Sequence, residues 1–226
     1  MIWGFFLNKM ATRMIPLSLF DSPAPTSLEF EKQARQRGFQ SIAGIDEAGR
    51  GPLAGPVVAA AVILPEHFSL PGLTDSKKLS ERRRQSLYPK IYQQARAVGI
   101  GVASSAEIDR LNILQATLLA MSRAIGRLSV SPDHLLIDGI TPVPLDLSQQ
   151  CIKQGDSRSL SIAAASVIAK VMRDRIMLIY HHQLPAYGFA SHKGYGTQQH
   201  RTTITEIGPS YLHRRTFAGV KEHLRD

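Results

Sequence analysis

The run Ile42-Ala43-Gly44-Ile45-Asp46-Glu47-Ala48-Gly49-Arg50-Gly51-Pro52 decides how this chain is interpreted. It starts as a short apolar strand and ends in two adjacent carboxylates, followed by a glycine-flanked arginine. Neighbouring strand side chains point to opposite faces, so both acids can face one site only if Glu47 reaches around from the strand end. A divalent cation offsets the repulsion between such carboxylates, and a Gly-Arg-Gly backbone can approach a phosphate closely. Metal and phosphate together indicate phosphodiester chemistry.

The composition indicates a globular protein with a polyanionic partner. The 226 residues are enough for one large domain, and 43% hydrophobic with 20% charged residues argues against wholesale disorder. The chain has 27 Lys and Arg against 18 Asp and Glu, a formal net charge of +9. Such a basic surface favours nucleic acid through counterion release, although a basic protein without that partner has the same totals.

Cysteine content and hydropathy predict a soluble, cytoplasmic protein. Cys151 is the single cysteine, so no intramolecular disulfide can form, and we expect it to be a small core residue. The sequence has no apolar run near the ~20 residues of a membrane-spanning helix. The apolar stretch at residues 2–7 is too short for the core of a signal peptide.

The order of apolar runs predicts an α/β fold with a mixed sheet. Residues 1–27 carry three prolines among small polar residues and are expected to be extended or disordered. Strands are expected at 41–45, 57–64, 98–103, 134–139 and around 151–152. Helices are expected at 29–37, 80–95, 112–128 and 160–180, with one or two more after residue 192. Early strands close together, followed by alternating helix and strand, are typical of a mixed-sheet α/β core.

Four acids share one situation, because each closes or follows an apolar run beside a glycine or a small residue. They are Asp46, Glu47, Asp138 and Asp156. Open α/β sheets place their sites at strand ends, and Mg²⁺ or Mn²⁺ accepts a few carboxylates from separate elements. Two such ions roughly 4 Å apart suit an in-line displacement at phosphorus. Structural alternatives stay open, because Asp138-Gly139 is also a turn signal and Asp156-Ser157 a helix cap.

The segment from Gly49 to Ala54 also matches the G-x-G-x-x-A fingerprint of dinucleotide-binding proteins. The residues that follow contain Pro56 and a valine-rich run, so they do not open a helix. Asp46 and Glu47 would also repel a pyrophosphate. We therefore reject this interpretation.

A series of blocks along residues 40–224 resembles ribonuclease HII, the bacterial type 2 ribonuclease H. The first block, Gly44 to Val57, looks like the signature of that family. The others follow in the family's order: Asp75-Ser76-Lys77-Lys78-Leu79-Ser80, Glu107-Ile108-Asp109 with Leu111-Asn112-Ile113-Leu114, Leu136-Ile137-Asp138-Gly139, Lys153-Gln154-Gly155-Asp156-Ser157, Ala163 to Lys170 with Arg173-Asp174, His192-Lys193-Gly194-Tyr195-Gly196-Thr197, and His213-Arg214-Arg215-Thr216-Phe217.

The resemblance implies a ribonuclease H-like catalytic domain over residues 28–190 and a C-terminal helical region, 191–226, that contributes to substrate binding. It also implies cleavage of RNA in RNA–DNA hybrids and at single ribonucleotides in duplex DNA. Water activated by Mg²⁺ or Mn²⁺ would attack on the 5′ side of a ribonucleotide and leave a 5′-phosphate and a 3′-hydroxyl. Residues 1–27 match nothing in the family.

The resemblance also assigns roles to residues. All four acids would bind the metal ions and act in catalysis. Gly49, Arg50, Gly51 and Tyr195 would recognise the ribonucleotide and its junction with DNA. By their charge, Lys77, Lys193 and Arg50 also suit phosphate contacts, and Ser76 and Asn112 are weaker candidates of the same kind. We do not expect His192 or His213 to be catalytic.

Two other classes of protein stay open beside a monomeric ribonuclease. A basic binding module without catalysis would explain the charge but not four acids at strand ends. A different nuclease of the same fold, such as a recombinase-type enzyme, would explain the acids and would cut all-DNA substrates. It would not be expected to carry both the Gly-Arg-Gly run and Tyr195.

Overall fold

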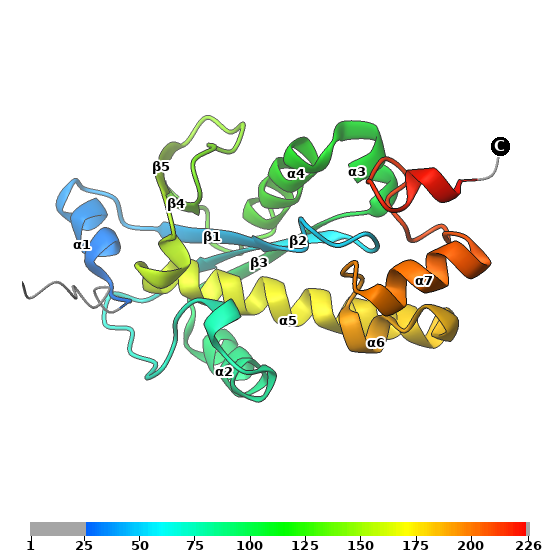
Figure 1. Cartoon of the computed structure of the whole chain (residues 1–226). Helices are drawn as coiled ribbons and strands as arrows, with labels where there is room; N and C mark the ends of the chain where they lie inside the picture. Colours follow the sequence, from blue (N-terminus) through cyan, green and yellow to red (C-terminus); the bar gives the residue numbers. More distant parts are fainter. Residues whose placement is uncertain (1–25, 225–226) are drawn as a thin grey trace, which may run out of the picture.

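The computed structural model of the protein describes residues 26–224, and its apolar runs build one five-stranded sheet with helices on both faces (Figure 1). The strands are β1 (Ile42–Ala48), β2 (Val57–Ile63), β3 (Ala97–Ala103), β4 (His134–Asp138) and β5 (Ser148–Ile152). The helices are α1 (Glu29–Gln36), α2 (Glu81–Gln94), α3 (Ser105–Leu111), α4 (Ile113–Ile125), α5 (Leu160–Gln183), α6 (Phe189–His192) and α7 (Gln198–Ile207).

The sheet is mixed, as the sequence predicts. Its strand order is β3-β2-β1-β4-β5. The first three strands form an antiparallel meander, whereas β4 and β5 add to β1 in parallel. Every residue of β2 is buried, because helices cover the sheet on both sides. The predicted α/β class is therefore confirmed.

Helix α5 lies unusually close to β1. A side chain on Gly44 would place its Cβ 2.2 Å from the backbone carbon of Ser161, so this position of the strand has room only for hydrogen. The Ala163–Ala165 stretch of α5 is fully buried in the core of the same face. On the opposite face, α4 packs its apolar side chains against the sheet. The close contact brings the start of α5 near the end of β4.

The first strand is longer than the predicted range of 41–45, so the boundary predicted at Ile45 is wrong. Strand β1 continues through both acids to Ala48, with Asp46 opposite Ala60 and Glu47 opposite Ala59 of β2. The two small alanines allow the ladder to continue past the acidic pair. The other predicted strands and helices match within a few residues, except that α3 was not expected.

The remaining expectations about organisation are partly tested. Residues 1–25, predicted to be extended or disordered, lie outside the described residues. Thr26 belongs to the ordered part, where its hydroxyl donates to the carbonyl of Ser157 at 3.0 Å. Cys151 is half-buried and packs against the core, in keeping with the expected role. None of the helices within residues 26–224 has the length and apolar character needed to cross a membrane.

Helices α6 and α7 and the C-terminal segment gather at the far end of α5, beyond the edge of the sheet (Figure 1). The helical C-terminal region expected from the sequence is therefore present. The division of the chain at residues 27 and 190 stays a prediction.

Candidate active site

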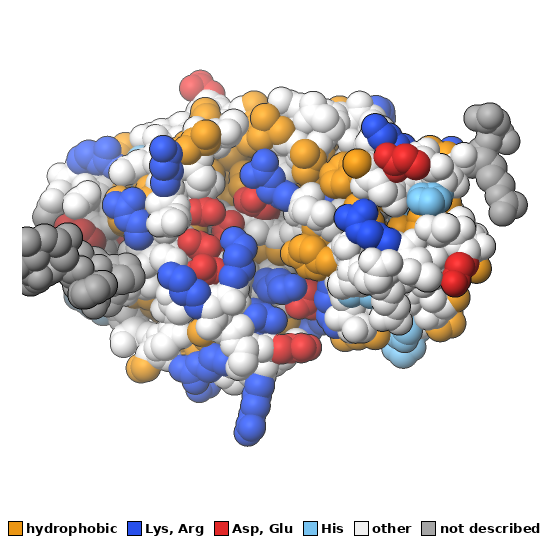
Figure 2. Space-filling view, viewed as in Figure 1, with side chains coloured by type: hydrophobic (Ala, Val, Ile, Leu, Met, Phe, Trp, Pro, Cys, Tyr) orange, Lys and Arg blue, Asp and Glu red, His pale blue; other side chains and the backbone are white. Residues whose placement is uncertain are grey.

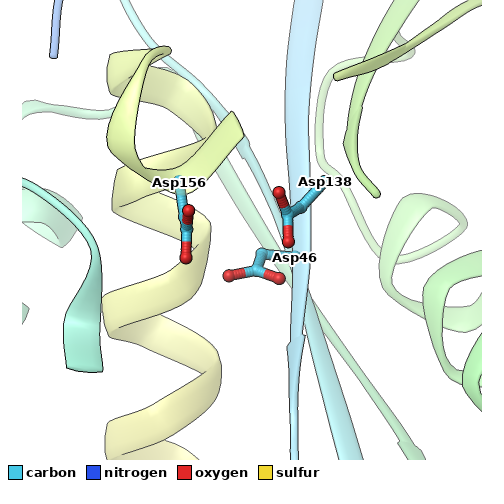
Figure 3. Close-up of side chains that lie close together, drawn as sticks. All are labelled: Asp46, Asp138 and Asp156. Atoms are coloured by element: carbon cyan, nitrogen blue, oxygen red, sulfur yellow. The ribbon is translucent and has the colours of Figure 1, made fainter. Parts of the chain in front are cut away.

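Three of the four predicted acids meet beside the sheet. Strands β1 and β4 pair in parallel with Ile45 opposite Ile137, so the next residues of the two strands are Asp46 and Asp138. Asp156 lies in the short 3₁₀ turn Gly155–Ser157 that precedes α5. One carboxylate oxygen from each acid lies within 4.8 Å of the others, and Figure 3 shows the three side chains pointing into one space.

Backbone amides fix the direction of two of these carboxylates. Asp46 Oδ1 accepts a hydrogen bond from the backbone N–H of Glu47 at 2.7 Å. Asp138 Oδ1 accepts one from the N–H of Gly155, also at 2.7 Å. The second bond ties the end of β4 to the turn that carries Asp156, so the same contact sets the distance between two acids.

The surroundings of Asp46 and Asp156 favour their protonated forms. Burial raises the pKa of Asp46 well above its usual value, and the charges of Glu47 and Asp138 raise it further. Burial and the charge of Asp138 raise the pKa of Asp156 to about 6. Asp46 is 3% exposed and Asp156 is 4% exposed. Buried carboxylates this close to one another need a positive charge between them to ionise together near neutral pH.

Glu47 takes a different position from the three aspartates. It follows Asp46 in a regular strand, so its side chain leaves the sheet on the α4 face. Its carboxylate lies 3.5 Å from Nη1 of Arg50. Burial raises its pKa, while Arg50 lowers it. Glu47 is thus outside the three-carboxylate group but borders Asp138 in an adjoining cavity.

Three cavities adjoin around the acids and together form what we call the central groove. The first, about 580 Å³, is lined by Asp138, Asp156, Lys77 and their neighbours. The second, about 320 Å³, lies between Glu47 and α4. The third, about 230 Å³, brings together residues from four segments: Glu47, Ala48, Gly49, Arg50, Gly51, Ser76, Lys77, Lys170 and Tyr195.

Lysine and arginine side chains surround the acids on this face (Figure 2). Nζ of Lys77 lies 3.9 Å from Asp156, and the Lys77 side chain is 78% exposed. Acids in the floor and cations along the sides suit a polyanion that is held near bound metal.

The other predicted contact residues divide into two groups. Ser76, Lys77, Tyr195 and the Gly49-Arg50-Gly51 run all line the third cavity. Lys193 and Asn112 line none of the three cavities of the groove. The Lys193 ammonium donates to the carbonyl of Ala190, and the Asn112 side chain caps α4 by accepting from Leu114 and Gln115. Their phosphate-binding roles stay predictions.

Two buried arginines support the groove, and sequence reasoning missed both. Arg214 is fully buried and donates to the carbonyl oxygens of Gly49, Arg50 and Gly55. Arg173, also fully buried, donates to the carbonyls of Ala54, Pro56 and Lys193. Both residues lie in the family-like blocks, but an arginine is usually exposed, so their burial could not be predicted from the sequence.

Lys170 is a further residue of the groove to which the sequence analysis gave no role. It lies one turn before Asp174 on α5, and its ammonium donates to that carboxylate at 2.7 Å. The same ammonium lies 6.0 Å from the centre of the Tyr195 ring. Its place inside the Ala163 to Lys170 block was the only available signal.

The chain is similar to one known protein family along most of its length. A model of the family Ribonuclease HII matches residues 43–220. The ribonuclease HII of Syntrophotalea carbinolica is 62% identical over 208 residues, which are 92% of this chain and 100% of the relative.

Solved structures share the fold. The ribonuclease HII of a PCNA complex from Archaeoglobus fulgidus has a TM-score of 0.68 and 26% identity, and the match covers 83% of this chain and 97% of that one. The ribonuclease H2 of Pyrococcus horikoshii OT3 has a TM-score of 0.68 at 22% identity, with 81% and 96% covered. The fold is therefore ribonuclease H-like, as predicted. The family match along most of the chain shows that this protein belongs to the ribonuclease HII family, the metal-dependent endoribonucleases of RNA–DNA hybrids.

Proposed function

We propose that this endoribonuclease hydrolyses the phosphodiester bond on the 5′ side of a ribonucleotide and leaves a 5′-phosphate and a 3′-hydroxyl. Its substrates are the RNA strand of RNA–DNA hybrids and single ribonucleotides embedded in duplex DNA. The observation that carries the proposal is the group of three carboxylates in the floor of a cation-lined groove, of which Asp46 and Asp156 are buried and Asp138 is half-buried. Phosphate chemistry explains both the acids and the surrounding positive charge.

The donor set fits a hard divalent cation. The three aspartates offer only oxygen ligands and lie within 4.8 Å of one another, and a cation would lower the raised pKa values of Asp46 and Asp156. We propose that they hold Mg²⁺ or Mn²⁺ and that Glu47 adds a fourth carboxylate from the α4 side. When bound, such an ion lowers the pKa of a water molecule and stabilises negative charge on the phosphate.

The backbone of Arg50 and Gly51 suits recognition of a 2′-hydroxyl, the one group that distinguishes the target from DNA. The Arg50 carbonyl is turned inward to Arg214, with 2.7 Å between the atoms. Within residues 26–224, the backbone N–H groups of Arg50 and Gly51 have no hydrogen-bond partner. Two unpaired donors beside the acids are available to oxygen atoms of a ribonucleotide.

The ring of Tyr195 suits the sugar of the next nucleotide. Tyr195 is 45% exposed and lines the same cavity as the Gly49-Arg50-Gly51 run. A ring at this position can pack against a deoxyribose, and its contact with the sugar changes when the sugar carries a 2′-hydroxyl. We therefore propose that Tyr195 reads the junction to DNA, while Lys77 and Ser76 contact the phosphates.

We also propose that the enzyme is a monomer and works in the cytoplasm. In the described part of the chain, the most exposed large apolar side chains, Ile140 and Tyr211, lie on separate segments rather than in one patch. A nucleic-acid substrate places the enzyme in the compartment of the chromosome. Sedimentation velocity at micromolar concentration tests the oligomeric state, and a dimer peak would contradict it.

Cleavage of a labelled DNA duplex that contains one ribonucleotide tests the proposed reaction. The purified protein is incubated with Mg²⁺ or Mn²⁺, beside an all-DNA duplex and the Asp46→Asn variant. We expect a cut only in the first duplex, on the 5′ side of the ribonucleotide, and no turnover by the variant although it still binds. Cleavage of the all-DNA duplex, or full activity of Asp46→Asn, would contradict the proposal.

A further inference from the structure

The loop of residues 193–196, which presents Tyr195 to the groove, is held through its carbonyl groups. Each of its four carbonyl oxygens accepts a hydrogen bond from a donor outside this loop. The pairs are Arg173 to Lys193, Leu53 to Gly194, His200 to Tyr195 and Arg201 to Gly196, at 2.8 to 3.0 Å. The path of the backbone at Tyr195 therefore depends on these donors, and one of them is an imidazole.

The tautomers of two histidines follow from their partners. Nδ1 of His213 faces the backbone N–H of Ser210 at 3.0 Å, and because an amide can only donate, this nitrogen carries a lone pair. In the neutral ring the proton is then on Nε2, which lies 3.0 Å from Nε2 of His200. His200 accepts there, so its own proton is on Nδ1 and is donated to the Tyr195 carbonyl at 2.9 Å. Each donor meets an acceptor in only this arrangement.

The surroundings keep both rings neutral. His200 is 0% exposed and His213 is 1% exposed, and His192 stacks on His200 with ring centres 4.3 Å apart. Burial lowers the pKa of both His200 and His213 to about 4, and Arg201 and His192 lower that of His200 further. A second proton on His200 would set two N–H groups against each other between the rings, and a second proton on His213 would set its Nδ1–H against the backbone N–H of Ser210. The chain of donors thus persists throughout the neutral range.

The same C-terminal segment also supports the other side of the groove. Its backbone lies along residues 53–55, with Arg214 N–H donating to Leu53 and Gly55 N–H donating to Leu212, both at 2.9 Å. The guanidinium of Arg214 holds the carbonyls of Gly49 and Arg50. Two consecutive side chains, His213 and Arg214, therefore lead to the two elements proposed to read the substrate.

We propose that His213 and His200 are positioning residues, which pass a one-directional chain of hydrogen bonds from Ser210 to the Tyr195 carbonyl and so set how sharply the enzyme recognises the junction between a ribonucleotide and DNA. This inference rests on the proposed role of Tyr195. Neither histidine touches the acids, so the chain acts on selectivity and not on the metal site.

Two variants of His213 test the chain of hydrogen bonds, because glutamine and asparagine carry the same amide group on side chains of different length. In His213→Gln the amide nitrogen takes the place of Nε2 and can still donate to His200. In His213→Asn the amide takes the place of Nδ1. It can still accept the hydrogen bond from the backbone N–H of Ser210, but it is too short to reach His200. We expect junction selectivity, the kcat/KM for a single embedded ribonucleotide divided by that for a long hybrid, to fall about tenfold in His213→Asn and to stay within about twofold in His213→Gln.

The Tyr195→Ala variant separates a failure of this inference from a failure of the proposed function. If Tyr195→Ala keeps the selectivity of the wild type, Tyr195 does not read the junction and the proposed function is wrong at that point. If Tyr195→Ala loses selectivity while His213→Asn keeps it, the histidines do not position Tyr195 and the inference is overturned.

Nitrogen-15 NMR of the imidazoles tests the chain in the unaltered protein, whether or not a variant folds. We expect His213 as the Nε2–H tautomer and His200 as the Nδ1–H tautomer, with neither titrating between pH 5.5 and 8. The same tautomer on both rings, or a titration of either ring in that range, would overturn the inference.

Discussion

The backbone N–H of Leu53 donates a hydrogen bond to the carbonyl oxygen of Gly194, and the two atoms are 2.8 Å apart. Leu53 follows the Gly49-Arg50-Gly51 run, and Gly194 precedes Tyr195, so this bond joins the two elements proposed to read the substrate. Arg173 reinforces the join, because one guanidinium donates to both Ala54 and Lys193. The elements are therefore set relative to each other before any substrate binds, which lowers the cost of ordering them.

Replacing Gly194 by alanine should break this join. Gly194 has a φ of +84°, and a Cβ there would lie 2.5 Å from the carbonyl oxygen of Ala54. We expect Gly194→Ala to lower kcat/KM on a single embedded ribonucleotide at least tenfold and to lower the free energy of unfolding by about 1–3 kcal/mol. Steady-state cleavage and urea denaturation measure the two effects.

Gly208→Ala is the matched control for that variant. Gly208 has a similar φ of +77°, but a Cβ there would meet nothing within 4 Å. The control therefore also places an alanine at a positive φ, but without the clash. Equal losses of activity in both variants would show that strain alone, and not the contact with Ala54, causes the effect.

Arg214→Lys should damage the groove although it keeps the charge. Lysine cannot reproduce the fork that serves Gly49, Arg50 and Gly55, so buried carbonyl groups lose their donors. We expect the free energy of unfolding to fall by roughly 2–4 kcal/mol and cleavage to fall at least tenfold. The neighbouring Arg215 is exposed, and Arg215→Lys should change unfolding by less than about 0.5 kcal/mol. Similar results for the two variants would remove Arg214 from the support of the loop.

Glu47→Gln should weaken metal binding without abolishing the reaction. Glu47 lies outside the group of three aspartates, yet it borders Asp138 and its pKa is raised by burial. Removing one charge from the ligand set lowers cation affinity, so the Mg²⁺ concentration for half-maximal activity should rise about tenfold. Cleavage measured across a titration of Mg²⁺ gives this value. Complete inactivity at saturating Mg²⁺ would place Glu47 beside Asp46 as an essential ligand.

Much of the fold could be predicted because the strands of this sheet are covered on both faces. The Val57–Ile63 strand is fully buried, so it is apolar throughout and visible in the sequence. The end of β1 could not be predicted in this way. Its continuation through Asp46 and Glu47 depends on pairing with Ala60 and Ala59, and a polar pair at the end of an apolar run resembles a strand end.

The acids of the site could be predicted, because they close or follow the apolar runs that form strands. Asp138 closes an apolar run and Asp156 follows one, and the structure places both beside Asp46. The supports of the groove were not predictable, because they depend on pairing between distant segments. Arg173 reaches the carbonyl of Pro56 across 117 residues of sequence, and only the folded chain shows that this guanidinium is buried. The histidine chain could not be predicted for the same reason, because the tautomer of each ring depends on its hydrogen-bond partners in the folded protein.

Neutralising Asp156 should stabilise the metal-free protein at neutral and alkaline pH. Burial and Asp138 raise the pKa of Asp156 to about 6, above the value near 4 that an aspartate has in an unfolded chain. Between these two pH values the folded state binds more protons than the unfolded state. The contribution of Asp156 to folding stability is therefore fully present below pH 4 and is lost as the pH rises through 6. Asp156→Asn removes this loss. Its melting temperature should exceed that of the wild type by several degrees at pH 8 and match it at pH 4.

Calorimetry on protein dialysed against EDTA measures this difference, and added Mg²⁺ reverses its sign. A cation that binds only the folded state raises the melting temperature of the wild type, and the variant should lose most of that gain because one ligand is neutral. Asp146 is exposed and lines no cavity of the central groove, so Asp146→Asn should change neither value. A melting temperature of Asp156→Asn at or below the wild-type value at pH 8 without Mg²⁺ would show that the acids do not repel one another. The carboxylates would then be held apart by the fold, and the case for a cation between them would rest on cleavage alone.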